Sequence, residues 1–463
     1  MSTPQSNITV SNHASREQLE RIFDILGNVF SVGRAFFQER LDNEPTYDPA
    51  NTWFATVDGV IASTVQIFPM PLRAGQAVLK VGGMGSVGTD ENYQGKGLAS
   101  RILSAQTAWM EQQGYHLSML LASRHSFYSR SGWQLLPETM LVLNNSAYQA
   151  SNDTASTQAS ADTGSEKLAH MQTQAPLQAN AAEGCSITPF SLEHIEEMSK
   201  LYDRFNANRT GSYVRNKTYW NSLVKWPTWK EAECLLLWQQ NKLIAYGIIA
   251  HTSNKQAILR EFIYDPQHEA DVMPLFAALC ELRKDAKQIL AKLPGDHMLF
   301  PHFKEQGSGS IELNVAMWKI IDGAGLFDVM HEELQNRLQS NQALSEQSFE
   351  LGLQTEKLSI HFSYADKQLQ ITVSADESQT SMESSSSTDT DTDASLNGIT
   401  VDTSEITLIK WLLYGYQADD GKAVAASDRA GFDAESDLEE KAGAILQALF
   451  PEQPYAFYIT DYF

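Results

Sequence analysis

Cysteine is scarce in this 463-residue sequence, and its spacing excludes two kinds of site. The three cysteines, Cys185, Cys234 and Cys280, stand far apart and form no CxxC pair. That spacing argues against a disulfide framework and a structural zinc site, and it fits a reducing compartment. The eleven histidines form no recognisable metal spacing either, so no metal is expected. With 42% hydrophobic residues, the chain can bury several cores without such staples.

Long hydrophobic runs are also missing. The longest nearly apolar stretch, residues 243–250, is much shorter than the roughly 20 residues that a membrane-spanning helix needs. The first ten residues are polar and lack the apolar centre of a signal peptide. We therefore expect a cytoplasmic protein with no membrane partner.

Positive charge is in short supply, because 34 Lys and Arg face 57 Asp and Glu, a net charge of −23. Recognition of nucleic-acid phosphates needs clustered Lys and Arg, so nucleic acid is excluded as the main partner. Residues 321–463 alone carry a net charge of −19. An acidic field attracts cations, which favours a cationic ligand, although solubility is the simpler interpretation of the charge alone.

Two low-complexity stretches divide the chain. Residues 146–183 are rich in Ser, Thr, Ala and Gln without an apolar period, which predicts a disordered linker or long loop. Residues 374–395 contain six acids and no base, and apolar strand patterns flank them, so they form an acidic insert inside one domain. Three folded blocks remain, at 1–145, 184–310 and 311–463.

The first block alternates helix and strand patterns. Residues 53–57 and 61–68 predict two strands joined by a tight turn at Asp58-Gly59. Leu98, Ile102, Ala105 and Trp109 form one apolar helix face, and residues 140–143 predict a strand that closes the block. The pattern predicts an α/β block with one mixed sheet.

The other two blocks have weaker patterns. The second repeats the theme in outline, with a strand at 257–264 and a helix near 271–284. The third has helices near 326–338 and 437–449 and strands beside the insert. It ends in an expected short strand at 456–459.

The run Gln94-Gly-Lys-Gly-Leu-Ala99 carries the clearest chemistry. It follows an apolar strand and opens a helix, where glycines let a ligand approach the backbone closely. The free N–H groups and positive dipole end of that helix suit a pyrophosphate. The run matches neither the GxxxxGK[ST] P-loop nor the GxGxxG dinucleotide fingerprint. A plain capping turn is the alternative, but the strand–loop–helix context favours an anion site.

Gln94-Gly-Lys-Gly-Leu-Ala99 resembles the Q/R-x-x-G-x-G/A signature of the GNAT acyltransferase superfamily. In that superfamily the loop holds the pyrophosphate of acetyl-coenzyme A. The resemblance implies that the following residues bind this co-substrate: Val87, Gly88, Thr89, Gln94, Gly95, Lys96, Gly97, Leu98, Ala99, Ser100 and Ser123.

The resemblance extends over the chain except for the two polar inserts. The second block resembles another GNAT fold, but Asp265-Pro-Gln-His268 follows its strand and offers no glycine cradle. The third block, entered at Met317–Asp322, resembles a sterol-carrier-protein-like domain. The chain is thus similar to the Eis (enhanced intracellular survival) acetyltransferases. This implies an α/β (α+β) class of tandem GNAT folds and a sterol-carrier-like domain, assembled as a homo-oligomer, a hexamer.

Tyr128 is the candidate general acid, because Ser126-Phe-Tyr-Ser-Arg-Ser-Gly-Trp133 matches the family's F-Y-x-R-x-G segment. A phenol with a reference pKa of about 10 can donate a proton to a thiolate as charge develops on the leaving sulfur. Packing under the sheet is the alternative role for this aromatic residue.

The terminal Phe463 is the candidate general base, since Eis-like proteins place their C-terminal carboxylate in the active site. The end of the chain is apolar and aromatic, as a buried terminus requires. Burial would raise the pKa of that carboxylate and make it a better base. A docked tail is the alternative, and Tyr462 stands where the family commonly has an acid. His125 is a weaker candidate base, because a lone loop histidine is more often structural.

These residues predict an acetyl-coenzyme-A-dependent N-acetyltransferase acting on a cationic amine, and the resemblance implies that this is an aminoglycoside, a polyamine or a lysine side chain. The alternative is an apolar-ligand-binding protein, in which the third block holds the ligand and the GNAT folds serve as a scaffold. An intact glycine loop favours the enzyme.

Overall fold

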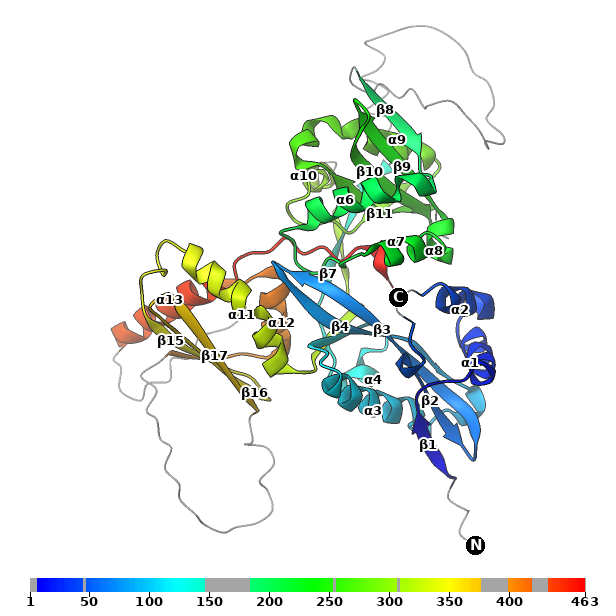
Figure 1. Ribbon diagram of the computed structural model, residues 1–463, viewed down its shortest axis with the longest axis horizontal. Helices are drawn as coiled ribbons and strands as arrows, with labels where there is room; N and C mark the ends of the chain where they lie inside the picture. The colour runs from blue at the N-terminus through cyan, green and yellow to red at the C-terminus, as the bar shows by residue number, and fades with distance from the viewer. Residues whose placement is uncertain are drawn as a thin grey trace.

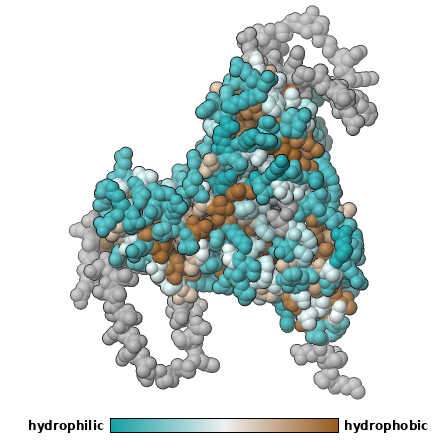
Figure 2. Space-filling view, viewed as in Figure 1, coloured by the Kyte–Doolittle hydropathy of each residue, from teal (hydrophilic) through white to brown (hydrophobic). Residues whose placement is uncertain are grey.

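The computed structural model describes residues 6–44, 47–145, 184–252, 255–305, 309–375, 399–418 and 432–462. The expected linker at 146–183 and nearly all of the insert at 374–395 lie outside these ranges, and so does Phe463. The described residues form three lobes, each built on its own sheet (Figure 1). On the face shown in Figure 2, hydrophilic residues predominate, and hydrophobic patches are scattered among them, including some where the lobes meet. The predicted α/β class with mixed sheets is confirmed.

The first sheet has the strand order β1-β2-β3-β4-β5-β14-β6. Its strands are β1 (Ile8–Ser11), β2 (Thr52–Val57), β3 (Val60–Ala74), β4 (Ala77–Thr89), β5 (Leu117–Leu121), β14 (Ala316–Ile320) and β6 (Gln134–Leu135). Strands β4 and β5 run parallel, and the neighbouring pairs are antiparallel. As predicted, β2 and β3 meet at a two-residue turn in which Asp58 and Gly59 have φ of 51° and 85°.

Helices cover both faces of this sheet, because side chains alternate along each strand. Trp53 of β2 packs with α3 (Leu98–Gln112) on one face. Phe54, its neighbour, packs with α1 (Arg16–Val29) on the other face. Helix α2 (Gly33–Asp42) follows α1 on that second face. The face with α1 and α2 thus lies opposite the face with α3.

The second sheet repeats this element order. Its strands are β13 (Ser310–Leu313), β7 (Glu138–Asn144), β12 (Gln288–Ala291), β11 (Gln256–Tyr264), β10 (Lys242–His251), β9 (Ala232–Gln239) and β8 (Cys185–Pro189), in that order. Its helices are α6 (Ile195–Asn206), α7 (Lys217–Leu223), α8 (Pro227–Lys230), α9 (Met273–Leu282) and α10 (Leu299–Glu305). Strands β11 and β12 are its parallel pair, as β4 and β5 are in the first sheet.

Two strands are exchanged between these sheets. Strand β7 was expected to close the first block, yet it pairs with β12 and β13 in the second sheet. Strand β14 was expected at the entry of the third block, yet it pairs with β5 and β6 in the first sheet. Each exchanged strand takes the same position in the strand order of the sheet that it joins. The expected domain boundaries at 145 and 311 each adjoin a strand that pairs in another lobe.

The third lobe has a four-stranded sheet in the order β17-β16-β15-β18. Its elements are β15 (Phe349–Gln354), β16 (Leu358–Ala365), β17 (Gln368–Ala375), β18 (Ile399–Asp402), α11 (Gly323–Ser340), α12 (Glu405–Tyr414) and α13 (Phe432–Leu449). The expected strand at 456–459 is wrong. Tyr455 forms only an isolated bridge with Thr210, and a short 3₁₀ turn, η7 (Ile459–Asp461), follows.

Candidate active site

The carboxyl ends of β4 and β5 define one edge of the first sheet. The two strands pair in parallel from Val81–Met84 to Leu117–Leu120, and β4 then continues beside β3 alone. Ala122, just after β5, turns away and donates its N–H to the Val315 carbonyl. In an α/β sheet, ligands bind at such an edge, where neighbouring strands part. The loops that follow β4 and β5 are therefore neighbours here.

A bulge interrupts β4 as it leaves β5. The register with β3 shifts between Thr64 and Gln66, and Ser86 takes a φ of 52°. Bulged residues leave the regular hydrogen-bond ladder, so their backbone groups become available to a ligand. The expected co-substrate residues Val87, Gly88 and Thr89 form this end of the strand.

The glycine loop lies between β4 and α3. Gly95 and Gly97 have φ of 76° and 71°, and a Cβ added to either would meet no atom within 4 Å. Gln94, Lys96 and both glycines are exposed. Gly97 caps α3 without a side-chain hydrogen bond, so the N–H groups of the first turn, at Leu98, Ala99 and Ser100, remain free for an anion. This open backbone fits the pyrophosphate of acetyl-coenzyme A.

Two cations lie at the glycine loop, one within it and one on the first turns of α3. Lys96 and Arg101 line an open hollow of about 500 Å³ together with Ser6, Asn7 and Ile8. Arg101 was missed in the sequence, although its position four residues after Gly97 places it one helical turn away. Both cations suit phosphate groups by their charge.

The start of the loop is held by Asp90. Its carboxylate accepts the N–H of Asn92 at 3.0 Å and pairs with Arg21 of α1. The Asn92 N–H, and then Arg21, hold the pKa of Asp90 below its usual value. These contacts fix the turn η2 (Glu91–Tyr93), which leads into the glycine loop.

Tyr128 lies on the loop that follows β5, in the short helix α4 (His125–Ser129). Its side chain is half-buried, and the Phe127 ring packs edge-on at 4.9 Å. Burial raises the pKa of Tyr128, while Arg124 opposes the rise, so the phenol keeps its proton at neutral pH. No described group hydrogen-bonds its hydroxyl, which leaves the proton available.

His125 has a structural contact instead. Its Nε2 lies 2.6 Å from the carbonyl oxygen of Asn314 and 3.0 Å from that of Ala122. This contact assigns the ring hydrogen to Nε2 and leaves Nδ1 as the ring nitrogen able to accept a hydrogen bond. This contact ties α4 to the segment before β14. Ser123, also expected at the co-substrate, is exposed on the same loop.

The segment before Phe463 approaches the first sheet from the second lobe. Tyr219 donates its hydroxyl to Asp461 at 3.2 Å and stacks on Tyr213 at 4.2 Å. Tyr213 donates to the Pro69 carbonyl of β3 at 3.0 Å. Two tyrosines thus connect Asp461 to the first sheet.

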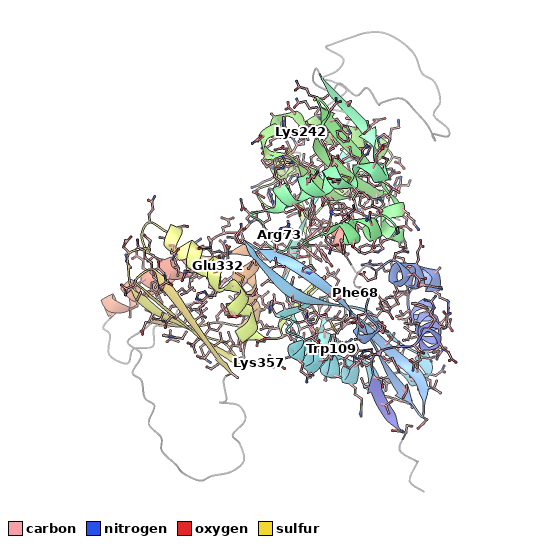
Figure 3. All side chains as sticks on the ribbon, in the orientation of Figure 1. Phe68, Arg73, Trp109, Lys242, Glu332 and Lys357 are labelled. Atoms are coloured by element: carbon pink, nitrogen blue, oxygen red, sulfur yellow. The ribbon has the colours of Figure 1, made fainter. Side chains whose placement is uncertain are left out.

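The two lobes also meet at the tip of the β3–β4 hairpin. Arg73 lies there beneath the second lobe and pairs with Asp203 of α6 at 2.8 Å (Figure 3). Phe68, nearer the middle of β3, packs with Arg40 of α2, whose guanidinium also stacks 3.1 Å above the Trp226 ring. The second lobe therefore contacts the first sheet on the face that carries α1 and α2.

Within the described ranges, no three His, Cys, Asp or Glu side chains are arranged to hold a metal ion. No helix in the same ranges is long and apolar enough to cross a bilayer.

Comparison with known proteins identifies the first block. Residues 12–136 match the family model of the acetyltransferase (GNAT) domain. No curated protein matches the chain. Residues 12–136 are thus a GNAT acetyltransferase domain, and the protein is an acetyltransferase. This finding favours the enzyme over the apolar-ligand-binding alternative.

Solved structures resemble the chain along its length. A conserved Enterococcus faecalis V583 protein described as a probable N-acyltransferase has a TM-score of 0.66 at 14% identity, covering 99% of this chain and 100% of that one. An Anabaena variabilis GCN5-related N-acetyltransferase has a TM-score of 0.63 at 13% identity, with coverages of 97% and 98%. Eis1 of Mycobacterium abscessus has a TM-score of 0.57 at 14% identity, with coverages of 97% and 99%. At such identities these likenesses show a shared fold.

Proposed function

We propose that this GNAT acetyltransferase moves the acetyl group of acetyl-coenzyme A to an amino group of a cationic small molecule or lysine side chain. The observation that carries the proposal is the parallel pairing of β4 and β5, which brings their carboxyl ends together. The glycine loop follows one strand and Tyr128 follows the other. The candidate phosphate cradle and the candidate proton donor therefore follow neighbouring strands.

The co-substrate would bind through backbone groups. Gly95 and Gly97 allow the pyrophosphate to approach the first turn of α3, and Lys96 and Arg101 add positive charge. The bulge of β4 beside Ser86 offers backbone groups toward the thioester.

Tyr128 would act as the general acid. The amine nitrogen attacks the thioester carbonyl carbon, a carbon–nitrogen bond forms, and the carbon–sulfur bond breaks. The departing thiolate takes the phenolic proton of Tyr128, which keeps that proton at neutral pH because burial raises its pKa. The phenolate regains a proton from solvent after the thiol leaves.

The carboxylate of Phe463 would act as the general base. An amine is mostly protonated at neutral pH and must lose a proton before or during attack. A carboxylate at the acceptor side can take that proton, directly or through a water molecule. His125 is the weaker candidate, because its Nε2 holds two carbonyl oxygens in a structural contact.

A cationic acceptor is consistent with the charge distribution. Residues 321–463 carry a net charge of −19, and the same part of the chain supplies the proposed base. An acidic field of this kind raises the local concentration of a polycation. Aminoglycosides, polyamines and lysine side chains are the classes proposed.

A panel assay tests the function. The protein is incubated with acetyl-coenzyme A and one amine at a time, and free thiol release is followed. We expect release with at least one aminoglycoside, polyamine or lysine peptide, and none with neutral alcohols of similar size. A thermal shift with acetyl-coenzyme A but none with a fatty acid would agree. Stabilisation by the fatty acid alone would contradict the proposal.

The assembly is proposed on the family resemblance, which implies a homohexamer. A cytoplasmic location is proposed because the three separate cysteines fit a reducing compartment. Light scattering of the purified protein measures the assembly directly, and a monomer at micromolar concentration would contradict it.

A further inference from the structure

The last described stretch of the chain, 455–462, lies against the second lobe although it belongs to the third block (Figure 1). Thr210 bridges Tyr455, and its carbonyl accepts the Ala456 N–H at 2.8 Å. Tyr458 is buried and donates its hydroxyl to Asn206 at 2.9 Å. Chain ends usually fray unless specific contacts hold them. Specific contacts therefore hold this terminal segment at the second lobe.

Arg215 makes the first strong contact. Its guanidinium is fully buried and donates to both carboxylate oxygens of Asp461, at 2.9 and 2.8 Å. It also donates to both oxygens of Glu261 on β11, at 3.0 and 2.6 Å. Planar paired hydrogen bonds fix direction as well as distance. Arg215 thereby fixes Asp461 relative to the second sheet.

The Arg215–Asp461 contact is not needed to neutralise the charge of Arg215. Glu261 alone already neutralises Arg215, so Asp461 is a second carboxylate on one cation. Burial raises the pKa of Asp461, and Arg215 opposes that rise. A buried ion pair is weak evidence for stability, because desolvation offsets much of the Coulomb attraction, whereas fixing register is its best-attested use. The main effect of Asp461 is therefore to fix a position.

Lys292 makes the second contact. Its buried Nζ lies 2.5 Å from Glu138, which begins β7. The ring centroids of Tyr455 and Phe457 lie 5.3 Å from the same Nζ, and that of Tyr462 lies 5.7 Å away. A desolvated cation attracts aromatic faces. Lys292, which follows β12, thus holds three rings of the terminal segment at the second lobe.

We propose that Arg215 and Lys292 are positioning residues for the acetyl transfer: the second lobe holds residues 455–462 in one register and so delivers the carboxylate after Tyr462 to the first lobe. This inference rests on the proposed role of that carboxylate as the base. It also gives the second lobe a task, since its β11–α9 connection has no glycine cradle. Displacing a reacting group by about 1 Å can cost about 100-fold in rate, so fixed anchors next to the terminus matter.

Three variants test the anchors. Asp461→Asn keeps the shape of the side chain, removes its charge and leaves Arg215 with its other carboxylate. Tyr219→Phe is milder, because it removes one hydrogen bond to Asp461 and no charge. Asp296→Asn is the matched control, since it removes a carboxylate from a different Asp–Arg pair of the same lobe, with Arg209.

Two readouts are taken on the full chain. The first is the rate at which carboxypeptidase releases residues from the terminus, followed by mass spectrometry. The second is kcat and KM for acetyl-coenzyme A, with an amine found in the panel assay. For Asp461→Asn we expect release about tenfold faster and kcat about 100-fold lower, with KM unchanged. We expect Tyr219→Phe to change the release rate and kcat in the same directions by smaller factors. Asp296→Asn should change neither the release rate nor kcat.

The outcomes separate the two proposals. If the terminus of Asp461→Asn and Tyr219→Phe stays as protected as in the unaltered protein, the Arg215–Asp461 contact does not hold the segment in register and the inference, which requires it, is overturned. If release accelerates while kcat is unchanged, the segment is held as described but Phe463 is not the base. Should Asp461→Asn fail to fold, Tyr219→Phe alone decides between these results.

Discussion

Tyr128 depends on one hydroxyl for its proposed role. Tyr128→Phe removes that hydroxyl and keeps the ring that packs on Phe127, so the fold should persist. We expect kcat to fall about 10²–10⁴-fold, the usual scale for general acid–base catalysis, with little change in acetyl-coenzyme A affinity. Steady-state kinetics and a binding titration measure both. Turnover within about threefold of the unaltered enzyme would mean that another group protonates the thiolate.

The pH profile of kcat tests the same residue. A general acid works while it is protonated, and a raised pKa extends the protonated range to higher pH. Burial raises the pKa of Tyr128 above its ordinary value of about 10. We therefore expect the alkaline fall of kcat to have its midpoint above about pH 10, and Tyr128→Phe to lack that limb. A midpoint near pH 8 that disappears in the variant would contradict the shift.

Residues within short motifs could be predicted, and residues joined through space could not. Gln94, Gly97 and Tyr128 could be proposed as site residues because the signature and the segment around Tyr128 are contiguous in sequence. Arg215 and Asp461 are 246 residues apart and meet only after both lobes fold. Nothing local in the sequence marks either as half of a buried pair.

The glycine loop is the element that the co-substrate would touch first. Gly97→Val adds a side chain to a position with φ of 71°, in open space where the pyrophosphate would lie. Gly59→Val is the matched control, because Gly59 has φ of 85° and equally open surroundings in the β2–β3 turn. Each variant carries a backbone strain of about 1–2 kcal/mol. The difference between them therefore reports the ligand contact.

Isothermal titration with acetyl-coenzyme A measures that difference. We expect Gly97→Val to lose binding and Gly59→Val to retain it, while both melt at similar temperatures. Equal affinity in the two folded variants would remove the glycine loop from the co-substrate site.

The exchange of β7 and β14 predicts which fragments of the chain can fold on their own. A fragment of residues 1–145 lacks β14 and leaves β7 without its partners in the second sheet. We expect this fragment to aggregate or to show poor chemical-shift dispersion by NMR. A fragment that ends at Leu136 and carries residues 315–321 on a short linker should be better ordered. Equal order in both would mean that β14 contributes little to the first sheet.

Strands β7 and β14 explain why that exchange was not predicted. Each is a short apolar run, and such a run indicates a buried strand without naming its partner. Sequential strands usually pair with each other, which favours closing the first block with residues 140–143. The partner of β7 is β12, whose register aligns Leu143 with Ile289. Only the folded arrangement of both sheets reveals that pairing.

At the scale of the whole molecule, all three lobes contribute to one proposed reaction. The first carries the glycine loop and Tyr128, the second carries Arg215 and Lys292, and the third sends the terminal segment across. Such an arrangement predicts that the two ends of the chain tolerate additions very differently. An addition at the N-terminus changes no group assigned to the proton transfers, whereas one after Phe463 moves the proposed base.

Comparing the turnover of three matched proteins tests whether the carboxylate of Phe463 is the general base. They are the unaltered chain, an N-terminally tagged chain, and a chain extended by one glycine after Phe463. The glycine keeps a carboxylate but moves it by about 3.3–3.6 Å, the reach of one residue. We expect the extended chain to lose at least about 100-fold in kcat while the N-terminally tagged chain keeps full activity. A fully active extended chain would contradict the proposal that the terminal carboxylate is the base.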